Sequence, residues 1–228
     1  MRFKGVLIDF GGTLAYIDEV ENTRYEEALV SKLWEYGCEL HLKDLDAILA
    51  DIYASSTKGD LNAPQEFWGL VLGKLGIPEQ PELIGALETI KSAHAPAMWK
   101  LYDGVLGVLA VLQKKYRLAL VSNCTTGTDR VLDSLGLTSF FGCMILSYQT
   151  GVRKPDRRMY HEALKCLRLE SEECVFVADE ISDLEGAREI GIETILVQQG
   201  RNRFQDAKNL EFRPDFQISQ ISEIINVL

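Results

Sequence analysis

The first residue that suggests chemistry is Asp9, which follows the apolar run of residues 6–8 and precedes a Gly-Gly-Thr turn at residues 11–13. An apolar run bounded by a glycine turn predicts a buried parallel strand. In an open α/β sheet, such strands present their carboxyl-terminal residues to the ligand crevice. A carboxylate there can act as a nucleophile or a metal ligand, although an aspartate before a turn can also simply cap it. Asp9 alone therefore leaves both interpretations open.

Two further polar signals lie at or just beyond predicted strand ends. Ser122 and Asn123 follow the apolar run 118–121, and a hydroxyl beside an amide is suited to holding phosphoryl oxygens. Lys154 precedes Pro155, and a residue before proline is held extended, so its ammonium can be aimed at a site. Each signal has an ordinary alternative, because Ser-Asn is a common turn and an isolated lysine is usually solvated.

Three acids follow the apolar run 175–178, namely Asp179, Glu180 and Asp183. Acids just before a helix often serve only to cap it. The carboxyl ends of parallel strands converge on one crevice, however. We therefore expect this acidic cluster to lie close to Asp9.

The elements that must position these residues alternate between strand and helix from residue 102 onward. We expect strands at 6–8, 117–121, 143–146, 174–177, 194–197 and 216–218, and helices at 105–114, 128–135, 157–167, 184–190 and 221–227. This alternation predicts an α/β fold with a doubly wound, mostly parallel sheet. Residues 201–213 are expected to form a surface loop of mixed charge.

Residues 16–98 follow a different pattern, with apolar residues at helical spacing in four stretches. These stretches cover residues 22–36, 45–52, 67–75 and 83–90. Such spacing predicts amphipathic helices that bury one face against each other. We therefore expect a core domain of residues 1–15 and 99–228, with an α-helical cap domain of residues 16–98 inserted after the first strand.

Composition limits the classes of function. The chain has 228 residues, 46% hydrophobic and 25% charged, which is typical of a soluble globular protein. Its net charge of −10 and the lack of a basic stripe argue against a nucleic-acid surface. No apolar run approaches the roughly 18 residues that span a bilayer, and the chain enters its first strand at once. We therefore expect no membrane segment and no signal peptide, and a cytoplasmic location.

The cysteines predict neither a disulfide framework nor a thiolate zinc site. They are five in number, with no Cys-x-x-Cys pair: Cys38, Cys124, Cys143, Cys166 and Cys174. An odd count without paired spacing is typical of reduced thiols.

The signals described above occur in a fixed order: an aspartate after the first strand, a serine after the next, a Lys-Pro pair and an acidic cluster. In this order, and with a helical insertion after the first motif, the chain resembles the haloacid dehalogenase superfamily of hydrolases over essentially its full length. The resemblance implies a phosphatase-like enzyme with a mobile helical lid over the core. It also implies a small phosphorylated metabolite as substrate, a monomer or homodimer as the assembly, and no nucleic-acid or membrane partner.

The resemblance assigns the acidic residues to nucleophilic and metal-binding roles. Asp9 would be the nucleophile and form an aspartyl-phosphate that water then hydrolyses. Mg²⁺ would be held by Asp9, the Gly11 carbonyl and Asp179, since oxygen ligands suit Mg²⁺ better than zinc. Glu180 and Asp183 would orient the metal through water or contact it, with Glu180 an alternative direct ligand.

The remaining motif residues would hold the phosphoryl group. Lys154 would neutralise the repulsion between a phosphoryl group and the attacking carboxylate, as both a catalytic and a substrate-binding residue. Ser122, Asn123 and the backbone amides around Phe10 and Gly11 would bind the phosphoryl oxygens, because backbone N–H groups in a glycine turn make good anion cradles.

Gly11 is the clearest departure from the family pattern. Phosphatases of this family usually carry a second aspartate two residues after the nucleophile, which protonates the leaving group and later activates water. Losing such a general acid typically costs about 10²–10⁴-fold in rate. Water, Asp18 or Glu19 of the cap, or a substrate with a good leaving group can compensate, so a phosphatase remains our main interpretation.

Two other interpretations stay open. A metal-independent 2-haloacid dehalogenase attacks carbon and needs no second aspartate, but the acids at 179, 180 and 183 would then repel a carboxylate substrate. A non-catalytic binding or regulatory protein is also compatible with Gly11. The joint presence of all four motif residues argues against that loss of turnover: Asp9, Ser122, Lys154 and Asp179.

Overall fold

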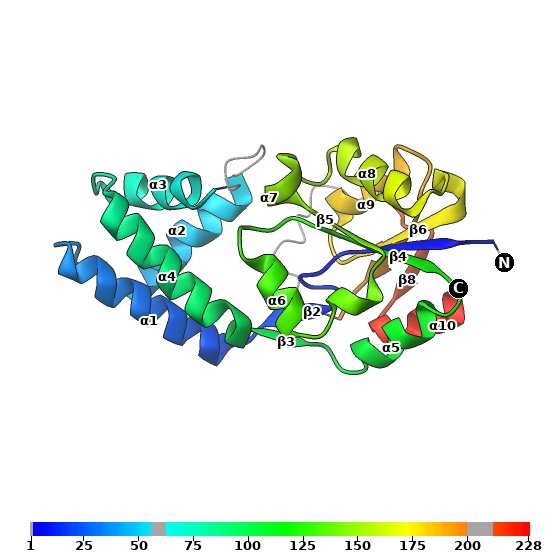
Figure 1. The fold of residues 1–228 in the computed structure, drawn as a ribbon, viewed down its shortest axis with the longest axis horizontal. Helices are drawn as coiled ribbons and strands as arrows, with labels where there is room; N and C mark the ends of the chain where they lie inside the picture. Colours follow the sequence, from blue (N-terminus) through cyan, green and yellow to red (C-terminus); the bar gives the residue numbers. More distant parts are fainter. Residues whose placement is uncertain (1, 56–62, 200–211) are drawn as a thin grey trace. The chain divides into compact units, whose positions relative to one another are not determined.

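The computed structural model describes residues 2–55, 63–199 and 212–228. It contains a six-stranded sheet in the order β5-β4-β1-β6-β7-β8, in which all neighbouring strands are parallel (Figure 1). The strands are β1 (Gly5–Ile8), β4 (Arg117–Ser122), β5 (Cys143–Leu146), β6 (Cys174–Ala178), β7 (Glu193–Val197) and β8 (Phe216–Ile218). The prediction of an α/β fold with a doubly wound parallel sheet is confirmed.

The register of the central strands explains why polar residues meet at one edge of the sheet. β1 lies between β4 and β6, and Ile8 is in register with Leu120 and with Val177. The residues that follow these three strands therefore emerge side by side. All four residues of β1 are buried, as expected for a strand covered on both faces.

Helices cover both faces of this sheet. α8 (Arg157–Leu167) and α9 (Ile181–Arg188) lie on one face, and α5 (Val105–Leu112) and α10 (Ile224–Val227) lie on the other (Figure 1). Shorter elements complete this unit, namely α7 (Ser147–Thr150), η1 (Thr138–Phe140), η2 (Ser171–Glu173) and η3 (Ile221–Glu223). The side chains of α8 and α9 form one core with the inner face of β1, β4 and β6.

Four longer helices account for the predicted cap stretches. They are α1 (Glu19–Glu35), α2 (Leu42–Ser55), α3 (Pro64–Leu75) and α4 (Pro81–Met98), packed around a second core that includes the fully buried Trp68. α1 begins at Asp18, whose carboxylate accepts hydrogen bonds from the backbone N–H groups of Val20 and Glu21. Two short strands, β2 (Ala15–Ile17) and β3 (Trp99–Leu101), pair where the chain enters and leaves these helices.

The chain divides into two compact units. A sheet unit comprises residues 1–16, 101–123 and 136–228, and a helical unit comprises residues 17–100 and 124–135. The sequence predicts that the core continues unbroken from residue 99, whereas α6 (Thr128–Ser134) packs with α4 in the helical unit. The hydroxyl of Thr126, just before α6, donates to Glu88 of α4, which helps to fix this segment there.

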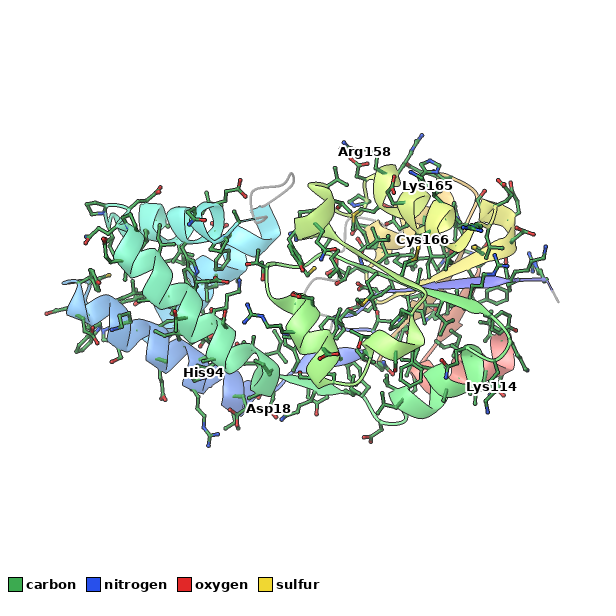
Figure 2. The ribbon with its side chains drawn as sticks, viewed as in Figure 1. Asp18, His94, Lys114, Arg158, Lys165 and Cys166 are labelled. Carbon is green, nitrogen blue, oxygen red and sulfur yellow. A yellow bond between two sulfur atoms is a disulfide. The ribbon has the colours of Figure 1, made fainter. Side chains whose placement is uncertain are left out.

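Cys143 of β5 and Cys166 of α8 form a disulfide, with Cα atoms 6.5 Å apart (Figure 2). The prediction of five reduced thiols is therefore wrong for this pair. Sequence spacing could not reveal it, because the fold alone brings residues 23 positions apart together. Within the three described ranges, no helix is long and apolar enough to cross a membrane. The predicted surface loop at 201–213 falls mostly outside the described residues.

Candidate active site

Asp9 lies directly after β1, and its backbone N–H donates to the carbonyl of Val177 in β6 at 2.9 Å. The residue is 6% exposed. Beyond it the chain turns tightly, because the Leu14 N–H donates to the Phe10 carbonyl and the Gly12 N–H donates to the Ala15 carbonyl, both at 2.8 Å. The end of the strand and this turn together fix the Asp9 carboxylate at the edge of the sheet.

Lys154 brings two acids together at this edge. Its Nζ lies 2.6 Å from Oδ1 of Asp9 and 2.7 Å from Oδ2 of Asp183, and its side chain is only 1% exposed. The ammonium also lies over the Phe176 ring, 5.5 Å from the centroid. Asp9, the predicted nucleophile, therefore forms one buried ion cluster with Lys154 and with Asp183 of the acidic motif.

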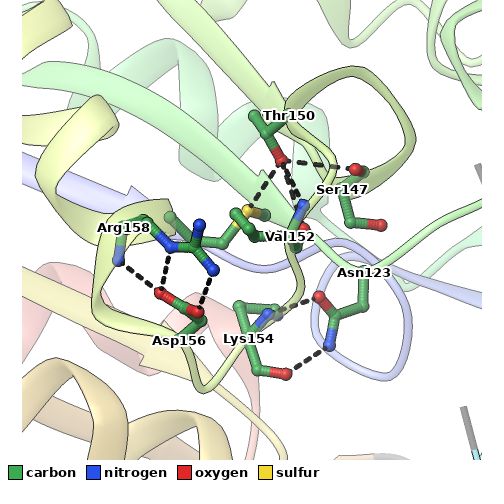
Figure 3. A network of polar contacts seen from close by, with 8 residues as sticks. Asn123, Ser147, Thr150, Val152, Lys154, Asp156 and Arg158 are labelled. Atoms are coloured by element: carbon green, nitrogen blue, oxygen red, sulfur yellow. Dashed lines mark hydrogen bonds and ion pairs between the residues drawn. The ribbon is translucent and has the colours of Figure 1, made fainter. Parts of the chain in front are cut away.

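The backbone of Lys154 is held as firmly as its ammonium. The Lys154 N–H donates to Oδ1 of Asn123 at 2.7 Å, and Nδ2 of Asn123 donates to the Lys154 carbonyl at 3.0 Å. Figure 3 shows the carboxamide facing the loop that carries Lys154. That loop runs from α7 to α8, and Asp156 caps α8 by accepting from the Arg158 N–H at 2.9 Å. Asn123 thus links the end of β4 to the lysine loop.

Asp183 is positioned through α9. It lies in the first turn of that helix and is 4% exposed. The Tyr160 hydroxyl of α8 donates to the backbone carbonyl of Asp183 at 2.7 Å, and the Tyr160 ring packs edge-on against Phe176, with centroids 5.3 Å apart. Tyr160 therefore holds the backbone of Asp183, and Phe176 packs against both Tyr160 and the Lys154 ammonium.

Asp179 follows β6 and packs against the turn after Asp9. The Thr13 hydroxyl donates to Oδ1 of Asp179 at 3.4 Å. Gly12 adopts a φ of +77°, and a Cβ at that position would lie 2.0 Å from Oδ2 of Asp179. Only glycine combines that backbone with so close an approach. Gln199 donates to the Thr13 carbonyl and accepts from the Ile221 N–H, which holds the turn from its other side.

The charges of this cluster do not balance. Burial alone would lower the pKa of Lys154, but the charges of Asp183 and Asp9 outweigh it and raise that pKa, so the ammonium stays protonated. Burial raises the pKa of Asp9 above its usual value, although Lys154 acts in the opposite direction. Burial, followed by the charge of Asp9, raises the pKa of Asp179 to about 8. One lysine therefore does not compensate the acids gathered here.

The donor atoms fit a hard divalent cation. Two buried or partly buried carboxylates, Asp9 and Asp179, flank a turn that supplies the Gly11 carbonyl, and all three groups offer oxygen. Oxygen-only donors that leave room for water suit Mg²⁺. Among the residues that the structure describes, no group of three or more His, Cys, Asp or Glu side chains is arranged to hold a metal ion by itself. A backbone carbonyl and water would have to complete the set.

The other predicted residues take different positions. Ser122 ends β4 and is 2% exposed, next to Asn123. Gly11 forms an isolated β-bridge with Ala15 and does not share the positive φ of Gly12. Glu180 is exposed at the N-cap position of α9.

Several supporting residues were not predicted from the sequence. Thr13 stands in the glycine turn and is fully buried, so its motif position could have suggested a structural role. Tyr160 and Phe176 look like ordinary core residues, and Gln199 lies in no motif. Asn123 was predicted, but its contact with the Lys154 backbone depends on which way a carboxamide turns, which no spacing reveals.

Comparison with known proteins gives three kinds of likeness. The family model for haloacid dehalogenase-like hydrolase matches residues 70–197. Glyceraldehyde 3-phosphate phosphatase of Methanopyrus kandleri is 26% identical over 228 residues, which cover 99% of this chain and 97% of the relative. (S)-2-haloacid dehalogenase 2 of Pseudomonas sp. is 28% identical over 155 residues, covering 68% of this chain and 57% of the relative.

The solved structures support the fold. The HAD-hydrolase YfnB of Bacillus subtilis, solved with magnesium bound, superposes with a TM-score of 0.70 over 100% of this chain and 99% of its own, at 19% identity. At that identity the likeness concerns the fold. A parallel sheet with helices inserted after its first strand is thus a fold shared with a solved structure.

Proposed function

The chain belongs to the haloacid dehalogenase-like hydrolase family, and from that premise we propose that it is a Mg²⁺-dependent phosphatase acting on a small phosphomonoester. The observation that carries this proposal is the buried contact of Lys154 with Asp9 and Asp183 beside an incompletely compensated Asp179. Acids with shifted pKa values around one cation, at the carboxyl edge of a parallel sheet, are typical of a reaction centre. The named phosphatase relative supports the same class of activity.

In the proposed reaction, Asp9 is the nucleophile. A carboxylate oxygen of Asp9 forms a bond to phosphorus while the bond to the leaving oxygen breaks, giving an aspartyl-phosphate. Water then attacks phosphorus, releases inorganic phosphate and regenerates the Asp9 carboxylate. Two easier displacements replace one difficult displacement.

Lys154 and the strand ends supply the positive charge and the donors. The Lys154 ammonium lies 2.6 Å from Asp9, so it would bind the oxygens of a phosphoryl group that approaches this carboxylate. The hydroxyl of Ser122 and the backbone N–H groups after Asp9 are further donors at this edge. Mg²⁺, held by Asp9, Asp179 and the Gly11 carbonyl, would offset the like-charge repulsion between nucleophile and substrate. Glu180 and Asp183 would act around the metal through water or through Lys154.

The substrate class follows from what Gly11 lacks. No acid stands at this position to protonate the leaving oxygen, and the Asp18 carboxylate, one candidate replacement, is engaged in capping α1. A leaving group of low pKa needs little protonation, so aryl or acyl phosphates are expected to react best. A small sugar phosphate, as in the name of the Methanopyrus kandleri relative, is the first metabolite to compare with them.

A 2-haloacid dehalogenase is a second candidate, favoured by Gly11 and by the Pseudomonas relative. Its nucleophile attacks carbon without a metal. With its pKa raised to about 8, Asp179 stays protonated near neutral pH in the absence of a metal and has no part in a dehalogenase reaction, whereas a bound cation would give it a role as a ligand. The phosphatase is therefore the better-supported function.

The cellular setting belongs to the proposal as well. We expect a monomer or homodimer in the cytoplasm that acts on a small metabolite, without a nucleic-acid or membrane partner. The Cys143–Cys166 disulfide is unusual for that compartment, where thiols are mostly kept reduced. Rapid alkylation of cells, followed by mass spectrometry of this pair, will test the location: a fully oxidised pair would contradict it.

The test of function is hydrolysis of p-nitrophenyl phosphate with and without Mg²⁺. We expect metal-dependent turnover that Asp9→Asn abolishes, while the exposed control Asp103→Asn keeps it. Gly11→Asp should accelerate the hydrolysis of glyceraldehyde 3-phosphate by up to about 10²-fold, and that of p-nitrophenyl phosphate less, because it restores an acid at this position. Chloride release from 2-chloropropionate would instead identify a dehalogenase. No turnover of any of these substrates would favour a non-catalytic binding protein.

A further inference from the structure

The most constrained backbone near the site belongs to Lys154, and one side chain constrains it. Asn123 accepts from the Lys154 N–H at 2.7 Å and donates to the Lys154 carbonyl at 3.0 Å. Both polar backbone groups of one residue are thus bound by one carboxamide, in the manner of a bridge between two strands. Figure 3 shows the two contacts side by side.

This pair of contacts defines which way the carboxamide faces. The oxygen must face the N–H of Lys154 and the nitrogen must face its carbonyl, because the reverse orientation would lose both hydrogen bonds. The nitrogen keeps one further N–H, but the oxygen and the N–H that bind Lys154 are committed to its backbone. Holding Lys154 is therefore the role that the contacts support, whereas the sequence suggested binding of substrate oxygens.

We propose that Asn123 is a positioning residue that sets the place of the Lys154 ammonium rather than a residue that holds the phosphoryl group. This inference rests on the proposed phosphatase for its consequence in the reaction. β4 continues directly into Asn123, and β4 pairs with β1, which ends before Asp9. The carboxamide thereby ties the lysine loop to the same sheet edge as the nucleophile.

The geometry explains why this anchoring matters. Lys154 extends from its loop to Asp9 and Asp183 through a buried side chain, so a shift of its Cα displaces the ammonium from both acids. A misplacement of about 1 Å in a catalytic group can cost on the order of 10²-fold in rate. Thr150, at the end of α7 just before this loop, contacts nearby backbone instead: its hydroxyl donates to the carbonyls of Ser147 and Val152 at 3.3 and 3.2 Å.

A labelling experiment tests the anchor without any need for turnover. Lys154 in the native full-length protein is acylated with an amine-reactive ester, and the rate at that residue is followed by mass spectrometry. Losing two hydrogen bonds in Asn123→Ala should raise this rate on the order of tenfold. The control Thr150→Val, which removes contacts of the same loop, should leave it within about twofold.

A kinetic cycle tests the consequence. With p-nitrophenyl phosphate and Mg²⁺, Asn123→Ala should lower kcat by about 10–10²-fold and change KM little. In a Lys154→Ala background, the same substitution should cost almost nothing more, because the group that it positions is gone. Asn123→Asp, which keeps the acceptor but sets a carboxylate against the Lys154 carbonyl, should not rescue kcat.

The outcomes separate this inference from the proposed function. If Asn123→Ala raises KM at unchanged kcat and leaves Lys154 labelling unchanged, Asn123 binds substrate and the inference is wrong. Additive losses in the double variant would overturn it as well. If labelling rises as expected but the wild-type protein hydrolyses no phosphate ester, the positioning role stands and the proposed phosphatase fails.

Discussion

Two lysines, one in each unit, have pKa values shifted in opposite directions: Lys154 is buried and Lys91 is partly buried. Lys154 of the sheet unit is 1% exposed in its side chain and lies 2.6 and 2.7 Å from two carboxylates, and its pKa is raised. Lys91 of the helical unit is 12% exposed in its side chain and lies 3.4 Å from the single carboxylate of Glu88, and its pKa is lowered. Burial works against the ammonium in both places.

The two lysines differ in the carboxylates that surround them. Glu88, the partner of Lys91, also accepts from Nε1 of Trp68 at 3.0 Å and from the Thr126 hydroxyl at 3.3 Å, so its charge is shared among several donors. Desolvation then outweighs the pairing at Lys91. At Lys154 two short contacts outweigh desolvation. The comparison indicates that Lys154 is held for its charge, whereas Lys91 belongs to a polar network that packs α4 against its neighbours.

The largest expected effect comes from Lys154→Met. Removing one partner of a buried ion cluster leaves Asp9 and Asp183 uncompensated, which typically destabilises a protein by about 3–5 kcal/mol. Phosphatase turnover should also fall to a small residual rate. Urea unfolding monitored by circular dichroism, with and without Mg²⁺, measures the first effect. A variant as stable as the wild type would show that the acids are not charged in the folded protein.

The next effect concerns Mg²⁺ and pH. Since the pKa of Asp179 is raised to about 8, this carboxyl binds a proton in the folded state that the unfolded chain releases near pH 4. Without metal, the contribution of Asp179 to stability is fully present below about pH 4 and is lost as the pH rises to about 8. Mg²⁺ competes with that proton, so its affinity should rise up to about tenfold per pH unit below pH 8 and then level off.

Thermal unfolding with and without MgCl₂, at about pH 6 and about pH 9, measures this linkage. The gain in Tm from the metal should be larger at the higher pH. In Asp179→Asn the difference between the two pH values should shrink, since the titrating group is gone. An equal gain at both pH values in the wild type would place the metal away from Asp179.

The smallest effect is expected from Lys91→Met. The variant loses a weak pair and relieves the burial of a charge, so unfolding free energy should change by no more than about 1 kcal/mol near pH 7. Because the pKa of Lys91 is lowered, burying its charge reduces the stability of the wild type at low pH, and this cost disappears as the pH approaches about 10.4. The unfolding free energy of the wild type should therefore rise relative to that of the variant as the pH approaches this value. For Lys154, with a raised pKa, the contribution stays constant over the same window.

Urea titrations of both variants and wild type at about pH 7 and about pH 10 give the comparison directly. Lys32→Met, which removes an exposed pair with Glu35 on α1, serves as the control and should change stability by at most about 0.5 kcal/mol. If Lys91→Met lowered the unfolding free energy as much as Lys154→Met does, the two lysines would have the same stabilising role.

Sequence reasoning succeeded where the physics is shared by all parallel sheets. The apolar runs before Asp9, Ser122 and Asp179 predicted strands, and parallel strands must end at one edge. The structure accordingly places Asp9 and Lys154 in contact. The order of strands and helices, and the helical insertion, were likewise readable from a change in apolar period.

Other features depend on contacts that no period encodes. The orientation of the Asn123 carboxamide follows from a loop that lies 31 positions further along the chain. The disulfide joins β5 to α8, which only the completed fold brings together. The membership of α6 in the helical unit rests on its packing with α4, and a helix of seven residues carries too little pattern to show which unit it joins.

That membership has a consequence for the order in which the protein can be made. The helical unit needs residues 124–135, yet β1 and β4 leave the ribosome before those residues do. The last segment of the helical unit is therefore synthesised only after β4 of the sheet unit. A cap transplanted to another core as residues 17–100 alone would lack α6, so exchanging caps between relatives requires grafting two separate segments rather than one.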